Sequence, residues 1–195
     1  MELLPRAFSR TKHMLAYIDT TRNLLVINSS SFNQAELFTT FLRKALGSLP
    51  VSLPILKSAP AHVLTNWLST GSLLPVGFVL GESCELREPC DDGGTIIARR
   101  EDLGNEDITR HVENGKFVSK LGIQWKDQLT CEVTDDFRMT KVKFTEHFQE
   151  SLDEQEYDTA QQVNDATFTL MVGTLGRFID NLIAEMGGLF ENESE

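Results

Sequence analysis

Between residues 116 and 146, apolar and polar side chains alternate with a period of two, which is the pattern of half-buried β-strands. We predict three strands, at 116–125, 128–134 and 138–146, because short polar segments separate the alternating runs. Such short connections favour antiparallel pairing, so the strands should form a meander with one face against a core. The residues expected to face that core are Phe117, Leu121, Ile123, Trp125, Leu129, Cys131, Val133, Val142 and Phe144.

Helical spacing dominates the C-terminal part of the chain, where apolar residues recur every three or four positions between 159 and 186. This pattern predicts a long amphipathic helix. Ahead of the meander we expect a hairpin from 12–19 and 24–28, followed by a helix that ends at Gly47. A shorter helix is expected to begin after Asn105, whose side chain suits a helix N-cap.

The order of these elements predicts an α+β fold with antiparallel sheets, packed helices, the three-stranded meander and the long C-terminal helix. We treat residues 1–188 as one α+β unit with two candidate subdomains, at about 1–75 and 76–188. Residues 189–195 are expected to form a disordered acidic tail.

The period of two also assigns residues to the second face of the meander. Ammonium groups spaced along a sheet are suited to contacts with phosphates, so the lysines of this face are candidate DNA-binding residues. The alternative is an ordinary polar sheet face in contact with water. The charged residues expected there are Lys116, Lys120, Lys141, Lys143 and Glu132.

The net charge of −11 weighs against a protein that neutralises phosphates. Most of the excess lies in one block, because residues 149–195 contain 11 acidic residues and a single basic residue, Arg177. Residues 1–148 contain 18 acidic and 17 basic residues. DNA responds to the local field, so an acidic block on another face need not prevent binding. The alternative for this block is a solvated helix surface with a frayed tail.

Two further basic positions are adjacent, at Arg99 and Arg100. Neighbouring strand residues point to opposite sides, so both reach water only at a strand end or in a loop. Both are candidate DNA contacts, and Arg100 with Glu101 is also a candidate contact to a second subunit. The alternative is local ion pairing with Glu101 and Asp102.

Near the N-terminus, Arg6 and Arg10 flank Phe8. Aromatic and arginine side chains are enriched at protein–protein interfaces, so these three residues are candidates for a dimer interface. The alternative is that Phe8 fills the edge of a core.

The sequence contains no glycine-rich phosphate loop, nucleophile elbow or zinc-protease helix. Cys84, Cys90 and His111 lack the usual zinc-site spacing, so we expect no metal, no cofactor and no enzymatic activity. Asp135 and Asp136 are typical of a turn, although an acidic pair can hold a cation in a nuclease. Three cysteines, with no signal segment and no membrane span, favour a cytoplasmic protein.

Four strings carry a resemblance: LLPRAFSR at 3–10, LRKALGSLP at 42–50, DGGTIIARR at 92–100 and HVENGK at 111–116. In this order and at this spacing they resemble the recombination-associated protein RdgC family of bacterial DNA-binding proteins. Family members carry a substantial segment before the position of Leu3, where this sequence has two residues.

The resemblance implies a non-catalytic homodimer that forms a ring around double-stranded DNA, with little sequence preference. It also implies that the protein limits the access of RecA to DNA during recombination, in the cytoplasm and at the nucleoid. A ring needs two interfaces in each subunit, so we expect a shortened subunit to bind DNA more weakly than a longer relative.

Two other functions remain open at this stage. The acidic C-terminal block predicts a protein-interaction module that engages a basic recombination protein without binding DNA. The acidic pair at Asp135 and Asp136 alternatively predicts a metal-dependent nuclease.

Overall fold

The structure is a computed structural model that describes residues 13–70, 74–90, 92–153 and 157–190. The chain divides into two compact units between Ser52 and Leu53. The boundary therefore precedes the position near residue 75 that the sequence suggested for two subdomains. Among the described residues, no helix combines the length and apolarity needed to cross a bilayer.

The first unit contains a hairpin of β1 (Ala16–Asp19) and β2 (Leu24–Ile27), followed by α1 (Phe32–Leu46). Asp19 holds the turn, because its carboxylate accepts hydrogen bonds from the backbone amide of Thr21 and from Arg22. The hairpin and the helix that ends at Gly47 confirm the sequence prediction.

No residue of α1 is buried, and large apolar side chains on this helix remain accessible. Leu37 is 57 % exposed and Phe41 is 65 % exposed. The two strands have four residues each, so their sheet offers little surface for a helix to cover. A two-stranded sheet of this kind is marginally stable by itself.

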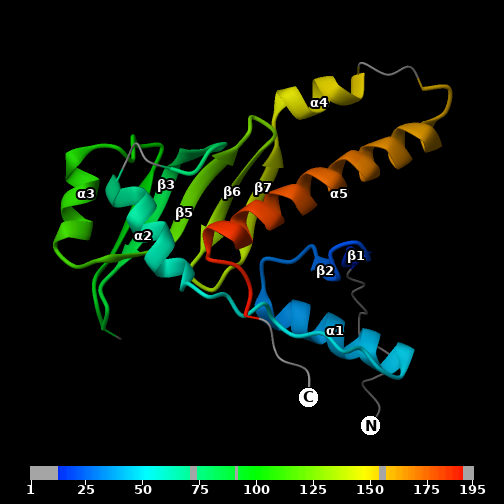
Figure 1. The fold of residues 1–195 in the computed structure, drawn as a ribbon, viewed down its shortest axis with the longest axis horizontal. Coiled ribbons are helices and arrows are strands. Elements are labelled where there is room, and N and C mark those ends of the chain that lie inside the picture. Colours follow the sequence, from blue (N-terminus) through cyan, green and yellow to red (C-terminus); the bar gives the residue numbers. More distant parts are fainter. Residues whose placement is uncertain (1–12, 71–73, 91, 154–156, 191–195) are drawn as a thin grey trace, which may run out of the picture. The chain divides into compact units, whose positions relative to one another are not determined.

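The second unit is built on a five-stranded antiparallel sheet in the order β4-β3-β5-β6-β7 (Figure 1). The last three strands are the predicted meander, and their antiparallel pairing confirms it. The strands are β3 (Phe78–Arg87), β4 (Thr95–Arg99), β5 (Phe117–Trp125), β6 (Leu129–Thr134) and β7 (Met139–Phe144).

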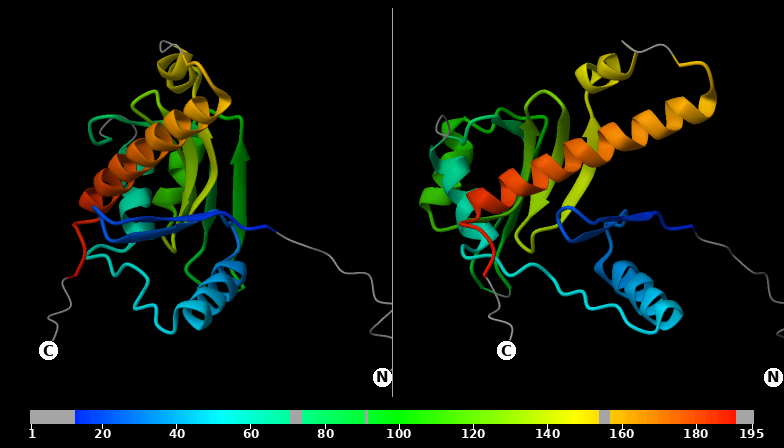
Figure 2. Two further views of the ribbon diagram at one scale, coloured as in Figure 1. Left: turned by 90° about the vertical axis from the view of Figure 1, so that its right-hand side faces the viewer. Right: turned by 45° about the vertical axis from the view of Figure 1, so that its right-hand side comes forward.

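Four helices accompany this sheet, and α2 and α5 lie against one of its faces (Figures 1 and 2). Asn105 caps α3 by accepting the amide of Asp107, as the sequence predicted. Thr159 and Gln162 form a capping box at the start of α5. The helices are α2 (Pro60–Thr70), α3 (Glu106–Glu113), α4 (Glu146–Asp153) and α5 (Ala160–Glu185). The α+β fold with a long C-terminal helix is thus confirmed.

A chain of aromatic rings joins the helices to the sheet and forms the centre of the core. Trp67 of α2 lies 5.2 Å from Phe78 of β3 between ring centroids, and Phe78 lies 6.2 Å from Phe178 of α5. Phe178 then meets Trp125 of β5 edge-on at 5.7 Å. Most of the predicted core-facing residues of the meander are buried here, Leu121, Ile123 and Trp125 among them.

Two β-bulges change which side chains point inward. On β5, Glu85 pairs with Lys120 but Leu86 pairs with Val118, so Ser119 is an extra residue. Val118 therefore takes the buried position that the alternation predicted for Phe117, which is only partly buried. A second irregularity lies between β6 and the edge strand β7, where Val142 is 39 % exposed and is therefore not buried in the core as the alternation predicted.

The C-terminal segment is paired as far as the structure describes it. Leu189 forms a β-bridge with Leu56, and the amide of Phe190 donates to the carbonyl of Ile55 at 2.8 Å. The first two residues of the predicted disordered tail are therefore paired with the segment before α2. Residues 191–195 lie outside the described residues.

Close approach of two strands at Gly122 gives a first prediction. A Cβ atom there would lie 2.7 Å from Ser83 Oγ and 3.0 Å from the Ser83 carbonyl oxygen, so the Gly122→Ala substitution has to displace β3. We expect a loss of about 1–3 kcal/mol in the free energy of unfolding, measured by urea denaturation. The control is Gly173→Ala in α5, where the nearest atom lies 3.8 Å away and helix propensity favours alanine. Equal stability of the two variants would contradict the close approach.

Candidate nucleic-acid interface

The sheet face opposite α2 and α5 gathers the charged residues that the meander predicts, together with residues of β3 and β4. We call it the open face. Its side chains point away from the core because their strand neighbours, such as Cys84, Leu121 and Cys131, are buried against the helices. Register places the same residues side by side across the strands. The open face consists of Ser83, Glu85, Ile97, Arg99, Lys120, Thr130, Glu132, Lys141 and Lys143.

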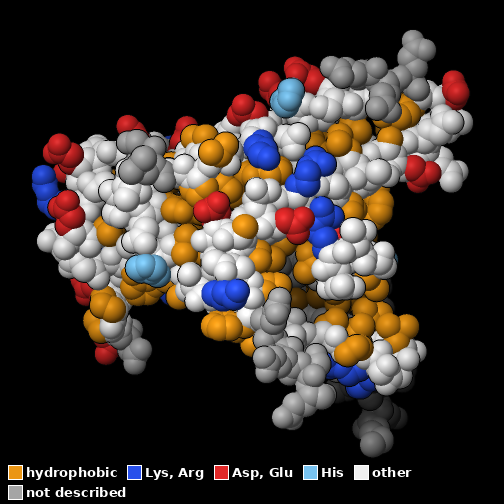
Figure 3. All heavy atoms as spheres, viewed as in Figure 1, with side chains coloured by type: hydrophobic (Ala, Val, Ile, Leu, Met, Phe, Trp, Pro, Cys, Tyr) orange, Lys and Arg blue, Asp and Glu red, His pale blue; other side chains and the backbone are white. Residues whose placement is uncertain are grey.

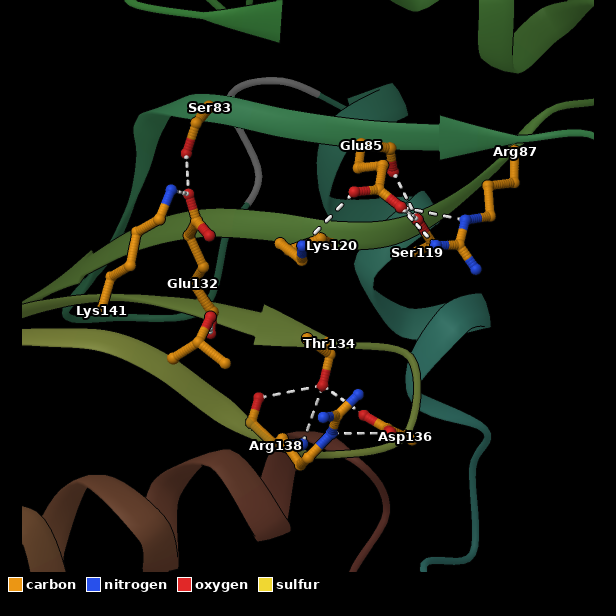
Figure 4. Close-up of polar contacts among 11 residues, drawn as sticks. Ser83, Glu85, Arg87, Ser119, Lys120, Glu132, Thr134, Asp136, Arg138 and Lys141 are labelled. Carbon is orange, nitrogen blue, oxygen red and sulfur yellow. Dashed lines mark hydrogen bonds and ion pairs between the residues drawn. The ribbon is translucent and has the colours of Figure 1, made fainter. Parts of the chain in front are cut away.

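Glu132 of β6 is the most enclosed charge of the open face, with 8 % of its surface exposed. It accepts a hydrogen bond from Ser83 Oγ at 2.9 Å and one from Lys141 Nζ at 2.7 Å (Figure 4). Burial by itself would raise the pKa of Glu132, but the contacts with Lys141 and Ser83 and the nearby Lys120 charge outweigh it and lower the pKa. Glu132 is therefore a carboxylate at neutral pH.

Glu85 of β3 is the second enclosed acid, and three side chains donate to it. Arg87 approaches Glu85 Oε1 at 2.6 Å, Ser119 Oγ lies at 3.0 Å from the same atom, and Lys120 Nζ lies 3.3 Å from Oε2 (Figure 4). Desolvation would raise the pKa of Glu85, but these donors outweigh it and the pKa falls below its ordinary value. Glu85 is thus also ionised.

Lys141 owes its direction to the irregularity in β7. Between the pairs Thr130–Lys143 and Glu132–Thr140, β7 has one residue more than β6, and Lys141 adopts a left-handed φ of 53°. Bulges of this kind redirect a side chain. Here the ammonium group turns back over β6 and reaches Glu132 (Figure 4).

The predicted lysines do not all share the open face. Lys120, Lys141 and Lys143 do, but Lys116 precedes the bulge of β5 and reaches the loop between β3 and β4. Its Nζ lies 2.6 Å from Glu88 Oε1 and 3.2 Å from the Gly94 carbonyl, and its side chain is only 11 % exposed. The ammonium group of Lys116 therefore binds the β3–β4 loop and lies apart from the open face.

Arg99 and Arg100 both reach water because β4 ends between them. Arg99 closes the strand, and Arg100 has a left-handed φ of 56° that turns the chain away. Within the described part of the chain, neither forms an ion pair with Glu101 or Asp102. Arg99 and Glu101 line one shallow hollow at the sheet edge.

Two other candidate groups have different outcomes. Phe8, Arg6 and Arg10 lie outside the described residues.

Asp136 of the acidic pair stabilises the β6–β7 turn, because Arg138 Nε donates to its carboxylate at 2.7 Å and Thr134 also forms a hydrogen bond with it (Figure 4). Among the described residues, no three His, Cys, Asp or Glu side chains are grouped so as to hold a metal ion.

Sequence reasoning missed the contribution of β3, which places Ser83, Glu85 and Arg87 beside the lysines. The signal was present as alternation, since Cys84 and Leu86 between them are apolar and buried. It did not reveal that β3 pairs with β5, although residues 88–116 lie between the two strands.

The charges of the second unit are unevenly distributed. The open face holds the basic side chains of Arg99, Lys120, Lys141 and Lys143 against two carboxylates. Acidic side chains gather instead over α4 (Figure 3). The open face thus carries more basic than acidic side chains, although the net charge of the protein is −11.

Comparison with known proteins gives consistent matches over nearly the whole chain. A family model described as "Putative exonuclease, RdgC" matches residues 1–189. Proteins named recombination-associated protein RdgC are 37 % identical over 187 residues in Serratia proteamaculans (strain 568) and 38 % identical over 185 residues in Pseudomonas fluorescens (strain Pf0-1). Each alignment covers 95 % of this chain, but 61 % and 60 % of the relatives. The chain therefore spans about three fifths of their length.

Proposed function

The chain belongs to the RdgC family of recombination-associated proteins, and we propose that its open face binds the phosphate backbone of double-stranded DNA. The binding is non-catalytic and has little sequence preference, because lysine and arginine heads on a sheet face contact phosphates and do not enter the grooves to read bases. The protein acts as a homodimer at the nucleoid in the cytoplasm and limits the access of RecA to DNA by occlusion.

The observation that carries this proposal is the row of four basic side chains on one sheet face. Arg99 lies on the edge strand β4, Lys141 and Lys143 lie on the other edge strand β7, and Lys120 of β5 lies between them. The row crosses the strands, so it offers several phosphate contacts on one surface.

The proposal predicts a specific salt dependence. Four phosphate contacts give a slope of log affinity against log salt of roughly −3.6 for each subunit, which is about a 100-fold loss between about 50 and about 200 mM salt. The measurement is fluorescence anisotropy of a labelled duplex of random sequence, repeated with a second sequence of the same length. Similar affinities for both sequences with a steep slope support the proposal. An affinity that does not change with salt, or no duplex binding at about 50 mM salt, refutes the proposal.

A second candidate function rests on the acidic surface of α4 and α5, where Glu146, Glu150 and Asp165 lie. This surface suits a basic partner protein that the chain binds without DNA. Capture of RecA by the pure protein in nuclease-treated, DNA-free buffer, together with no duplex binding, would favour this candidate.

A further inference from the structure

Glu85 and Glu132 lie in the middle of the proposed DNA-binding surface, where a phosphate-binding protein has no evident need for acids. Each is almost enclosed, with side-chain exposures of 12 % and 10 %. Lys120 and Lys141, which pair with them, are 35 % and 63 % exposed. Each lysine is therefore more exposed than the acid with which it pairs.

The two ion pairs use the same donors that a phosphate would use. A lysine ammonium has three N–H donors, and a carboxylate oxygen occupies the position beside it that a phosphate oxygen can take. Lys141 Nζ lies 2.7 Å from Glu132 Oε1, which is the distance of a strong charge-assisted bond. Each carboxylate also places a negative charge within a few ångströms of any phosphate that reaches its lysine.

The surrounding structure keeps these acids charged and in place. Ser83 and Ser119 donate to them from β3 and β5, so the carboxylates do not depend on the lysines alone for hydrogen bonds. The left-handed conformation of Lys141 turns this lysine towards Glu132. The ion pairs are thus built into the strands rather than formed by free surface side chains.

From these contacts we propose that Glu85 and Glu132 restrain DNA affinity by holding Lys120 and Lys141 in internal ion pairs. The proposal rests on the proposed DNA-binding function of the open face. It assigns the two acids a regulatory role at the same site: they weaken the hold on phosphates, which favours a protein that moves along DNA and leaves it readily. Phosphate binding then exchanges one partner of each lysine for another.

The test removes each charge and keeps the shape. In Glu132→Gln and Glu85→Gln, the remaining amide oxygen still accepts the serine hydroxyl, and the lysine loses its anionic partner. We expect each substitution to tighten binding to a random duplex roughly three- to tenfold at about 50 mM salt, from the loss of one nearby like charge and the release of one lysine. The salt slope is expected to stay near that of the unmodified protein, because the same lysines contact phosphates in both complexes.

The matched control is Glu185→Gln, which removes one exposed acid from the end of α5. Its effect is expected to stay below about twofold, because α5 lies on the other side of the sheet and salt screens its charge. Thermal melting of every variant shows whether it is folded, and the two glutamines on different strands provide independent tests.

Each outcome decides between the two proposals. Tighter binding of either folded glutamine variant than of the control supports the restraint, even where the unmodified protein binds too weakly to measure. Unchanged or weaker binding of both variants, beside measurable binding of the unmodified protein, overturns the restraint and leaves DNA binding standing. If none of these proteins binds duplex DNA, both proposals fail.

Discussion

Charge reversal of Arg99 and Lys143 together is expected to lower affinity for double-stranded DNA about 100-fold at about 50 mM salt, because it replaces two phosphate contacts with two repulsions. Fluorescence anisotropy with a random duplex measures the loss. The slope of log affinity against log salt is expected to flatten by about 2 in the same experiment. A uniform loss across duplex sequences follows from contacts to the backbone.

These two residues are preferred to the other lysines for a structural reason. Among the described residues, neither Arg99 nor Lys143 forms an ion pair, so their substitution leaves no buried carboxylate without its cation. Both are exposed, at the two edge strands of the open face. Replacing Lys116 or Lys141 would instead leave Glu88 or Glu132 without its cation, which mixes a folding effect with a binding effect.

The control reverses two arginines on helices, with Arg110→Glu in α3 and Arg177→Glu in α5. Arg110 pairs with Asp107 and Arg177 donates to Thr174, so thermal melting shows whether this variant is folded. Both side chains are exposed, and the change in net charge is the same. We expect this control to lose less than about fivefold, since it alters only the long-range field. Equal losses in the two double variants would mean that DNA responds to total charge, and the open face would no longer be the binding surface.

Much of the fold follows from local patterns in the sequence. The meander and the long helix are visible because periods of two and 3.6 persist over many residues, and each pattern reflects one buried face. Bulges interrupt that logic. Ser119 fits the alternation of β5, and only its pairing with β3 shows that it is the extra residue. Phe117 and Val118 consequently exchange their expected roles.

The candidate site shows the same division between local and distant information. The lysines of β5 and β7 were predicted because they lie within one meander. Glu85 and Ser83 were not predicted, because they lie beside the lysines only through the pairing of β3 with β5. No local period in the sequence records that pairing. These ion pairs change the interpretation of the lysines as phosphate contacts, because Lys120 and Lys141 already have anionic partners within the protein.

Truncation of Phe178 to alanine is expected to cost about 3–5 kcal/mol of the free energy of unfolding, the largest stability effect that we predict for one substitution. The Phe178 ring is fully buried in α5 and touches the aromatic rings of both Phe78 and Trp125. Its removal leaves a cavity between the helix and two strands, and the surrounding rings lack partner atoms on one side. Urea denaturation followed by circular dichroism measures the loss.

The control for this substitution lies on the same helix. Phe168 is 51 % exposed, so Phe168→Ala removes the same atoms from a largely hydrated position and is expected to cost about 1 kcal/mol. Phe178→Leu, which keeps part of the ring volume, should fall between the two. Trp125 emission should also change in Phe178→Ala but not in Phe168→Ala, because the Phe178 ring packs edge-on against that indole. If both alanine variants were equally stable, α5 would not be docked on the sheet through Phe178, and the helix would not define which face of the sheet is open.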